Sequence, residues 1–369
     1  MIDTLKFYEY LCARGMDFFA GVPDSLLKNL CACIKDRSDA SHNIITANEG
    51  NAVATACGYH LATGRYGVVY MQNSGEGNAV NPLMSLADED VYNIPLLLVI
   101  GWRGEPGVHD EPQHVKQGKV TLPLLDAMGI NYQILTDDYI GQIDSSLQYM
   151  QETNCPTALI VRKGLFSDYK IAPEDNGFAL IREQALAAVL GGLGDQDFIV
   201  STTGKTSREI FELREKAGQG HANDFLTVGS MGHTASIAFG MSIGTDKDVY
   251  CIDGDGSFIM HMGGFAVIGQ NCGPNFKYVL INNGAHESVG GQPTVALKID
   301  VPAILRACGF TDVHQATDEA GISAALQAMK GHGKTALIIY CRQGSRADLG
   351  RPTTTPIQNK QAIMEKIAQ

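Results

Sequence analysis

Short apolar runs alternate with segments of helical periodicity along the whole chain. The apolar runs are residues 18–22, 44–47, 67–71, 96–100 and 158–162 in the first half, and residues 198–201, 225–228, 249–252, 278–281 and 336–340 in the second half. Runs that are apolar throughout predict strands buried on both faces, as in parallel sheets. Because helical segments separate these runs, the sequence predicts an α/β protein with doubly wound parallel sheets.

The two halves end on closely similar segments, which indicates two related domains in tandem. Residues 157–162 read TALIVR, and residues 335–340 read TALIIY. A length of 369 residues is enough for two domains, each with its own core. A polar stretch after residue 165 is the best linker candidate. We therefore predict domains at residues 1–165 and 181–369, with a linker at residues 166–180.

Composition and charge exclude several classes of protein. The net charge is −12, whereas a nucleic-acid surface needs clustered basic residues. The longest strongly apolar run, residues 94–102, is too short to span a bilayer, and the first residues do not resemble a signal peptide. The nine cysteines are scattered and lack the spacing of a zinc site, which favours a reduced protein. We expect a cytoplasmic protein with neither a nucleic-acid nor a membrane partner.

The most informative polar motif joins two predicted strands of the second half. GDGS begins at Gly254, at the end of one strand, and an Asn pair that ends at Asn283 closes the next strand; residues 257–270 are predicted to form the helix between them. A right-handed crossover brings Asp255 and Asn283 to the same edge of the sheet. Carboxylate and amide oxygens suit Mg²⁺, which is often completed by ligand phosphates. Glycines such as Gly256 would let a phosphate approach the backbone and the helix N-terminus.

This pattern resembles the diphosphate- and metal-binding motif of thiamine diphosphate enzymes. A lone GDG could be an ordinary turn, but the first half contains a second constellation. Glu49 lies in NEGNA, between a predicted strand and an Ala-rich helix, where a Glu could also simply cap the helix. The pyruvate decarboxylase group of these enzymes carries a Glu in this context, in a domain that binds the pyrimidine ring. The segments around Gly21, Pro23 and Asn73 resemble two other cofactor-facing loops of that group.

The resemblance implies a fold, cofactors and site residues. We expect the thiamine diphosphate-binding fold in both halves, thiamine diphosphate and Mg²⁺ as cofactors, and a homo-oligomer with active sites between subunits. Glu49 would be the catalytic residue, bonding to the pyrimidine ring and starting a proton relay, which needs a buried carboxyl group with a raised pKa. The implied metal ligands are Asp255, Asn283 and the carbonyl of Ala285. The implied cofactor contacts are Gly21, Pro23, Glu49, Asn73, Gly204, Gly229, Met231, Gly254, Asp255, Gly256, Ser257 and Asn283.

The implied reaction is the decarboxylation of a small anionic 2-oxo acid. A chain of 369 residues leaves no room for the third domain of larger members of the group. Its compact arrangement, with GVPDSLL at 21–27, QNSG at 72–75 and GGQPT at 290–294, is similar to the phosphonopyruvate and sulfopyruvate decarboxylases. Fusion of both domains in one chain, with the segment 203–209, favours conversion of 3-phosphonopyruvate to phosphonoacetaldehyde and CO₂ in phosphonate biosynthesis. Sulfopyruvate decarboxylation is the alternative, followed by a carboligase and by a non-catalytic binding protein of this fold.

A phosphonate substrate needs cations near the reacting carbon. The segment 101–119 contains many glycines and prolines, follows a predicted strand, and is expected to form a loop that offers several cations. An Arg could bind a phosphonate through two hydrogen bonds, and a His could transfer a proton. Because loop charges are more often solvated, each residue stays an open candidate. The candidate substrate residues are Ser25, Arg103, His109, His114, Lys116, His286 and Gln292.

Overall fold

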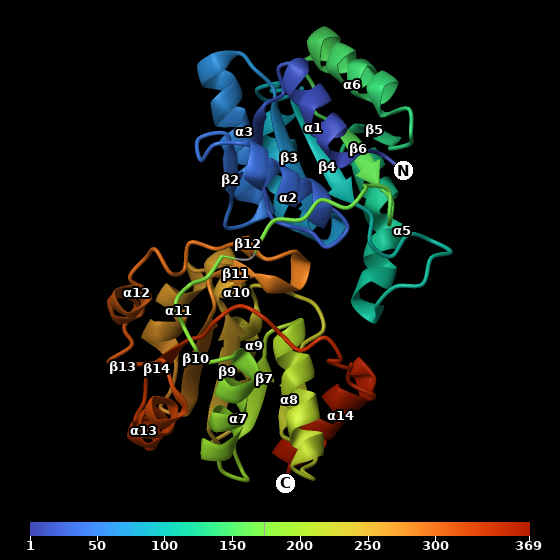
Figure 1. Cartoon of the computed structure of the whole chain (residues 1–369). Coiled ribbons are helices and arrows are strands. Elements are labelled where there is room, and N and C mark those ends of the chain that lie inside the picture. The colour runs from blue at the N-terminus through green and yellow to red at the C-terminus, as the bar shows by residue number, and fades with distance from the viewer. Residues whose placement is uncertain (173) are drawn as a thin grey trace. The chain divides into compact units, whose positions relative to one another are not determined.

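Two six-stranded parallel sheets organise the computed structural model, which describes residues 1–172 and 174–369 (Figure 1). Each sheet belongs to a separate unit. The first unit consists of Met1–Ala172 together with the short segment Val289–Gln292, and the second contains the other described residues. The division of the chain falls within residues 166–180, where we expected a linker. At the start of that segment, Phe166 is buried in the core of the first unit.

The first sheet has the strand order β2-β1-β3-β4-β6-β5. Its strands are β1 (Phe18–Gly21), β2 (Asn43–Ile45), β3 (Gly67–Gln72), β4 (Leu96–Gly101), β5 (Asn131–Ile134) and β6 (Thr157–Val161). The helices of this unit are α1 (Thr4–Ala13), α2 (Lys28–Arg37), α3 (Glu49–Thr63), α4 (Glu76–Pro82), α5 (Pro112–Ala127) and α6 (Tyr139–Thr153), with short helical turns at Asn73–Gly75 and Leu83–Ala87.

The second sheet has the strand order β13-β14-β10-β9-β7-β8, and β11 and β12 form a separate pair. The strands are β7 (Phe198–Ser201), β8 (Asp224–Leu226), β9 (Val249–Gly254), β10 (Phe276–Asn282), β11 (Ala285–His286), β12 (Gln292–Pro293), β13 (Asp312–Ala316) and β14 (Thr335–Tyr340). The helices are α7 (Arg182–Gly192), α8 (Lys205–Lys216), α9 (Thr234–Ile243), α10 (Asp255–Met260), α11 (Gly264–Asn271), α12 (Val301–Cys308), α13 (Glu319–Met329) and α14 (Pro356–Ile367), with a short turn at Glu287–Val289.

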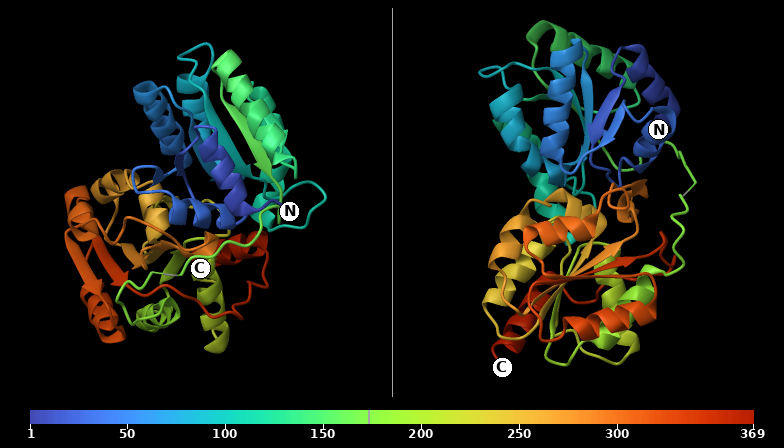
Figure 2. Two further views of the ribbon diagram at one scale, coloured as in Figure 1. Left: turned by 45° about the horizontal axis from the view of Figure 1, so that its top comes forward. Right: turned by 90° about the vertical axis from the view of Figure 1, so that its left-hand side faces the viewer.

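The two large sheets have the same topology. Counted in chain order within each sheet, the strands lie in the sequence second, first, third, fourth, sixth, fifth. Every neighbouring pair in both sheets is parallel. Helices cover both faces of each sheet (Figure 2). This confirms the predicted fold class of two tandem, doubly wound α/β domains.

Inner strands alternate their side chains between two cores, one on each face of the sheet. In β4, Leu97 and Val99 belong to one buried cluster, and Leu96, Leu98 and Ile100 belong to the other. The strands β9, β10 and β14 of the second unit divide their residues in the same way. Because successive residues of a strand point to opposite faces, burial of both faces requires an apolar residue at every position. This explains why the inner strands are continuous apolar runs.

Within the two large sheets, the strands that were not predicted are edge strands, and the other two edge strands were predicted with displaced bounds. β5 and β13 were not predicted, and β2 and β8 begin and end one or two residues earlier than expected; the two-residue strands β11 and β12 were not predicted either. The strands β2, β5, β8 and β13 are the outermost strands of the two sheets. An edge strand pairs on one side only and is less completely buried, so it keeps polar residues such as Gln133 and His314. Such residues interrupt the apolar run on which the prediction depended.

Two predicted segments also differ in the structure. The helix expected at residues 257–270 is two helices, α10 and α11, because the chain turns before Gly264, where a pair of glycines disfavours a continuous helix. The segment 101–119 was expected to be a loop throughout. It becomes helical at Pro112, where α5 begins, since a proline is well tolerated in the first turn of a helix.

Three features are absent from residues 1–172 and 174–369. None of the helices there combines the length and the apolar character that a membrane span requires. All nine cysteines are free of disulfides. No group of three or more His, Cys, Asp or Glu side chains in the described parts of the chain is placed to hold a metal ion. The implied magnesium ligands contain a single carboxylate, so they do not form such a group.

A buried lysine ties the start of β10 to the end of α13. Lys277 is fully buried, and its Nζ donates to the carbonyls of Pro274 at 2.8 Å and Met329 at 3.1 Å, and also to that of His332. Met329 is the last residue of α13, where carbonyls have no partner within the helix. Lys277 therefore satisfies the carbonyls of Pro274 and His332, while the carbonyl of Met329 also accepts from the backbone N–H of His332 at 3.3 Å.

We expect Lys277→Met to lower the free energy of unfolding by on the order of 3 kcal/mol. The substitution keeps most of the apolar volume but removes the buried ammonium group and its three hydrogen bonds to backbone carbonyls. Urea denaturation of the full chain, followed by circular dichroism, measures the change. Lys330→Met, at an exposed lysine just after α13, is the matched control and should change the stability little. Equal midpoints for the two variants would contradict this role of Lys277.

Candidate functional site

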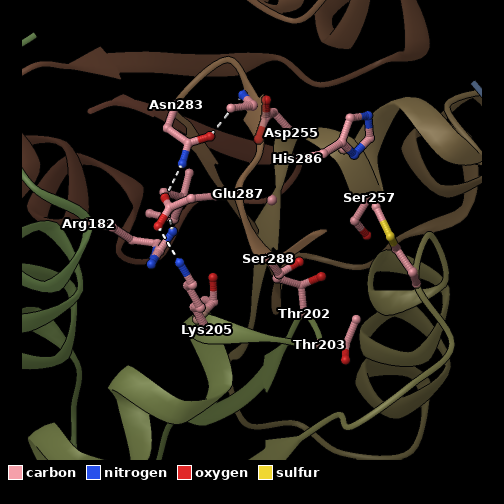
Figure 3. A pocket seen from close by; sticks show the side chains of 16 residues that line it. Arg182, Thr202, Thr203, Lys205, Asp255, Ser257, Asn283, His286, Glu287 and Ser288 are labelled. Carbon is pink, nitrogen blue, oxygen red and sulfur yellow. Dashed lines mark hydrogen bonds and ion pairs between the residues drawn. The ribbon is translucent and has the colours of Figure 1, made fainter. Parts of the chain in front are cut away.

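A pocket in the second unit gathers most of the residues expected to hold a diphosphate and a cation (Figure 3). In the parallel pairing of β9 with β10, Ile281 lies opposite Gly254. Asp255 and Asn283 follow these positions closely, so both reach the same edge of the sheet. The lining consists of Arg182, Thr202, Thr203, Lys205, Thr206, Met231, Gly254, Asp255, Gly256, Ser257, Ile281, Asn283, Ala285, His286, Glu287 and Ser288.

Asp255 is a deeply buried carboxyl group on this pocket. It is 4% exposed, and its Oδ2 accepts a hydrogen bond from the hydroxyl of Thr294. Burial raises the pKa of Asp255 to about 7. A cation in contact with the carboxylate would lower that pKa and stabilise the charged form. With the amide oxygen of Asn283 and the carbonyl of Ala285, the pocket offers an all-oxygen set of donors, which fits a hard divalent cation.

The amide of Asn283 is held at both ends. Its Nδ2 donates to Glu287 at 2.8 Å, and its Oδ1 accepts from the backbone N–H of Ala285 at 3.1 Å. Glu287 also accepts from Arg182 at 2.7 Å and from Lys205 at 2.9 Å, as Figure 3 shows. Burial alone would raise the pKa of Glu287, but Arg182 and then Lys205 outweigh it and lower the pKa. Glu287 is therefore a charged acceptor at neutral pH.

Other residues of the predicted set also meet in this pocket. A Cβ on Gly256 would lie 2.8 Å from Nδ1 of His286 and 3.1 Å from Cε of Met231, so only glycine fits without displacing them. The hydroxyl of Ser257 accepts from the backbone N–H of Gly232 at 3.1 Å. Burial lowers the pKa of His286 to about 4, so its ring is neutral at pH 7. Gly256 and the neutral imidazole of His286 thus lie side by side in the lining of the pocket.

Two helices begin beside the pocket. α10, which starts at Asp255, has only six residues. α8 has 12 residues, and its first residues Lys205 and Thr206 line the pocket. It follows Gly204, whose φ of 93° lies in the left-handed region that favours glycine. The positive end of a helix dipole attracts anions, so the start of α8, the longer helix, is better suited than that of α10 to attract an anion. Gly204 and Gly229, both predicted as cofactor contacts, are not among the residues that line the pocket.

Glu49 occupies a buried position in the first unit. It is the first residue of α3, but the helix is capped by Asn48, whose side chain accepts from the N–H of Asn51. The carboxyl group of Glu49 is 5% exposed and accepts from Nδ2 of Asn78 at 2.7 Å. A Cβ on Gly75 would lie 2.3 Å from it, so glycine there leaves room for the carboxyl group. Burial raises the pKa of Glu49.

Arg103, a predicted substrate residue, is already paired within the first unit. Its Nε donates to Asp110 at 2.7 Å, its Nη2 also contacts Asp110, and its Nη1 donates to the hydroxyl of Ser25 at 2.7 Å. Ser25 lies next to the buried Asp24, which accepts from Nε2 of Gln72 at 2.6 Å. The positive charge of Arg103 is therefore balanced by Asp110, and an anion bound there would share the guanidinium with it.

The other predicted substrate residues differ in exposure, and His114 lies near enough to Arg103 for an electrostatic interaction. His109 and Lys116 are exposed. His114 is buried on α5, and burial lowers its pKa to about 4, so it is uncharged at neutral pH. Gln292 is buried in β12, and its side-chain amide has no hydrogen-bond partner in the described part of the chain.

Two predicted cofactor contacts of the first unit have structural partners. The side chain of Asn73 donates to the carbonyl of Arg103 at 2.8 Å and to the hydroxyl of Thr121 at 2.9 Å, and accepts from the N–H of Arg103 at 3.1 Å. It therefore fixes the chain after β4. A Cβ on Gly21 would lie 2.1 Å from the carbonyl of Tyr70, so packing against β3 already requires glycine. Pro23 follows β1 and is buried.

Several side chains that complete these sites were not found from the sequence. Thr294 bonds to Asp255, Arg182 bonds to Glu287, Asn78 bonds to Glu49, and Asp110 bonds to Arg103. Asn78 stands in a segment already singled out for its likeness to a cofactor-facing loop. Thr294 also stands in a segment already singled out, GGQPT at 290–294, whereas Arg182 and Asp110 carry no local signal, because an ordinary Arg or Asp is recognised only by the partner that folding brings to it.

Comparisons with known proteins agree with this geometry. The thiamine pyrophosphate enzyme N-terminal TPP binding domain matches residues 6–128, and the corresponding C-terminal TPP binding domain matches residues 202–340. A phosphonopyruvate decarboxylase of Streptomyces hygroscopicus is 33% identical, over 96% of this chain and 92% of its own. One of Streptomyces viridochromogenes is 33% identical, over 97% and 93%. A sulfopyruvate decarboxylase of Methanosarcina acetivorans is 26% identical, over 88% and 87%.

These matches confirm the resemblance inferred from the motifs. The two matched domains lie one in each unit, and each contains one of the two constellations, around Glu49 and around Asp255. The identity extends over nearly the full length of the relatives as well as of this chain. The chain therefore belongs to the thiamine diphosphate-dependent decarboxylase family.

Proposed function

We propose that this protein decarboxylates 3-phosphonopyruvate to phosphonoacetaldehyde and CO₂ in phosphonate biosynthesis, with thiamine diphosphate and Mg²⁺ as cofactors. Membership of the family makes it a thiamine diphosphate-dependent 2-oxo acid decarboxylase. The observation that supports phosphonopyruvate as the substrate is the sequence identity, which is 33% to a phosphonopyruvate decarboxylase and 26% to a sulfopyruvate decarboxylase. The expected cytoplasmic location and the homo-oligomer with active sites between subunits are also kept as proposals.

Sulfopyruvate is the second candidate substrate. Fusion of both domains in one chain was expected to favour phosphonopyruvate. That argument does not discriminate, because the sulfopyruvate decarboxylase of Methanosarcina acetivorans aligns over 87% of its own length with this single chain. The two substrates differ mainly in the charge and geometry of one anionic group, so the choice between them depends on the side chains that meet this group.

In the proposed site, the pocket of the second unit holds the diphosphate end of the cofactor. Asp255, Asn283 and the carbonyl of Ala285 would bind Mg²⁺, with phosphate oxygens and water completing its coordination. Ser257 and the start of α8 beside Gly204 would contact the diphosphate. When bound, the cofactor supplies the electron sink for the loss of CO₂.

The remaining groups would position the ring, the proton and the substrate. Met231 would support the cofactor ring, and the carbonyl of Gly229 would accept from its amino group, as the resemblance implies. Glu49 would hold the proton exchanged with the pyrimidine ring, which its burial and raised pKa support. The paired guanidinium of Arg103, together with Ser25, is proposed to receive the substrate's anionic group.

A parallel assay tests the substrate. Purified protein with thiamine diphosphate and Mg²⁺ is given phosphonopyruvate, sulfopyruvate and pyruvate, and aldehyde formation is measured for each. We expect the highest kcat/KM with phosphonopyruvate. A higher value with sulfopyruvate would show that sulfopyruvate is the substrate, and the proposed decarboxylation would still hold. No aldehyde from any of the three compounds would reject the proposed activity.

Cofactor binding should depend on a divalent cation and on Asp255. We expect calorimetry to detect uptake of thiamine diphosphate by the wild-type protein with Mg²⁺ but not after treatment with EDTA. Asp255→Ala should weaken that uptake at least 10-fold, because it removes the only carboxylate among the proposed ligands. Undiminished binding by this variant would exclude Asp255 as a metal ligand.

A further inference from the structure

We propose that Glu287 is a positioning residue that determines which end of the Asn283 amide faces the cation. This inference rests on the proposed magnesium site. A carboxamide has an oxygen, which can bind Mg²⁺, and an NH₂ group, which cannot. The two ends have nearly the same shape, so only their hydrogen-bond partners decide which one points inward. A metal ligand of this kind needs a partner that accepts only one of the two orientations.

Glu287 is such a partner. A carboxylate can only accept hydrogen bonds, and Glu287 is kept charged by contact with two cations, Arg182 at 2.7 Å and Lys205 at 2.9 Å. It therefore attracts the NH₂ end of Asn283, which lies 2.8 Å away, and repels the oxygen end. Figure 3 shows the amide nitrogen of Asn283 directed at Glu287. The N–H of Ala285 favours the same orientation and uses one lone pair of Oδ1, which leaves the other for a cation.

The carboxylate is itself held in place. Arg182 donates Nε and Nη2 to Glu209 at 2.6 and 2.8 Å, and both side chains are almost fully buried. Bidentate pairs of this kind are rigid, so Arg182 presents Nη1 to Glu287 in a defined direction. One oxygen of Glu287 is used by Lys205, and the other is used by Arg182 and Asn283. With both oxygens engaged, Glu287 orients the neighbouring ligand instead of binding the cation.

Mn²⁺ binding, measured by electron paramagnetic resonance in the presence of thiamine diphosphate, tests this role without any assay of activity. Four proteins are compared: wild type, Glu287→Gln, Asn283→Asp and the double variant. Glu287→Gln should weaken Mn²⁺ binding about 10- to 100-fold, because the new amide can donate as well as accept and no longer selects the orientation of Asn283. The substitution keeps the size of the side chain.

In the Asn283→Asp background, Glu287→Gln should have the opposite effect on Mn²⁺ binding. An aspartate has an oxygen at both ends, so there is no orientation to select, and its charge faces that of Glu287. In this background Glu287→Gln removes a repulsion and should strengthen Mn²⁺ binding. Glu287→Ala, which also removes the carboxylate, should show the same reversal and replaces the Gln variant if the latter does not fold.

Two kinds of result would overturn the inference, and they are distinguishable. If Glu287→Gln binds Mn²⁺ as tightly as the wild type, or weakens binding equally in both backgrounds, Glu287 does not orient the amide, although the metal site stands. If the wild-type protein binds no Mn²⁺ even with thiamine diphosphate present, the proposed cofactor site is wrong, and the role of Glu287 falls with it.

Discussion

Glu49→Gln is expected to lower the rate of aldehyde formation about 10²- to 10⁴-fold while thiamine diphosphate still binds. Gln has the same size and can still form a hydrogen bond with the pyrimidine ring and with Asn78, which bonds to Glu49 at 2.7 Å. It carries no proton that it can exchange. Because burial raises the pKa of Glu49, its carboxyl group exchanges a proton nearer to neutral pH than an exposed Glu would. The substitution therefore removes the proton relay and keeps the packing.

Initial rates at saturating substrate, together with calorimetry of cofactor binding, measure this effect. Glu9→Gln, at an exposed position on α1, is the matched control and should keep the wild-type rate. Activity within a factor of two of wild type for Glu49→Gln would show that another group moves the proton. A loss of cofactor binding in the same variant would instead make Glu49 a binding residue.

Glu76→Gln is expected to remove a loss of stability that the first unit suffers as the pH rises. Glu76 begins α4 and is 2% exposed, and neither carboxyl oxygen has a hydrogen-bond partner in the described residues. The hydroxyl of Thr121 beside it already donates to the carbonyl of Gln117 at 2.9 Å, so its one proton is not free for Glu76. Burial raises the pKa of Glu76 from 4.5 to about 8.

The sign of the effect follows from proton binding. Between pH 4.5 and about 8 the unfolded chain has released the proton of Glu76, whereas the folded protein still holds it. The free energy of unfolding therefore falls as the pH rises through this range. The contribution of Glu76 to the stability of the folded protein is fully present only below pH 4.5. At about 1.4 kcal/mol for each pH unit, the loss is on the order of 5 kcal/mol above the folded-state pKa.

Urea denaturation of the full chain at pH 5 and pH 9 measures this difference. We expect Glu76→Gln to match the wild type within about 1 kcal/mol at pH 5 and to be several kcal/mol more stable at pH 9. The exposed control Glu9→Gln should follow the wild type at both values of pH. A difference between Glu76→Gln and the wild type that does not vary with pH would mean that Glu76 is charged in the folded protein.

The inner strands, and the meeting of the residues that follow them, were predictable from the sequence. One physical rule governs the first and another governs the second. Burial of both faces makes the central residues of β3, β4, β9, β10 and β14 continuous apolar runs. Parallel pairing places the carboxyl ends of neighbouring strands at one edge, so the spacing of Asp255 and Asn283 was enough to predict that they share a pocket. The edge strands β5 and β13 escaped prediction because one side of each lacks a neighbouring strand.

The electrostatic surroundings of the candidate residues were not predictable. Arg103 and His114 both read as possible cations, but Arg103 is paired with Asp110, and burial keeps His114 uncharged at neutral pH. In the same way, α5 converts part of an expected loop into a helix, which places His114 inside and Lys116 outside. Charge state depends on burial and on partners, and a single sequence carries neither.

The sequence by itself determined the two tandem sheets, the cofactor family and the main residues at the strand ends, because each depends on local periodicity and on short motifs. The tertiary structure alone decided how these residues are held. Arg182 and Glu287 are 105 positions apart, and Asp255 and Thr294 are 39 apart, yet each pair is joined by a hydrogen bond. Such contacts arise only when the packed core brings distant segments together, so no local pattern can encode them.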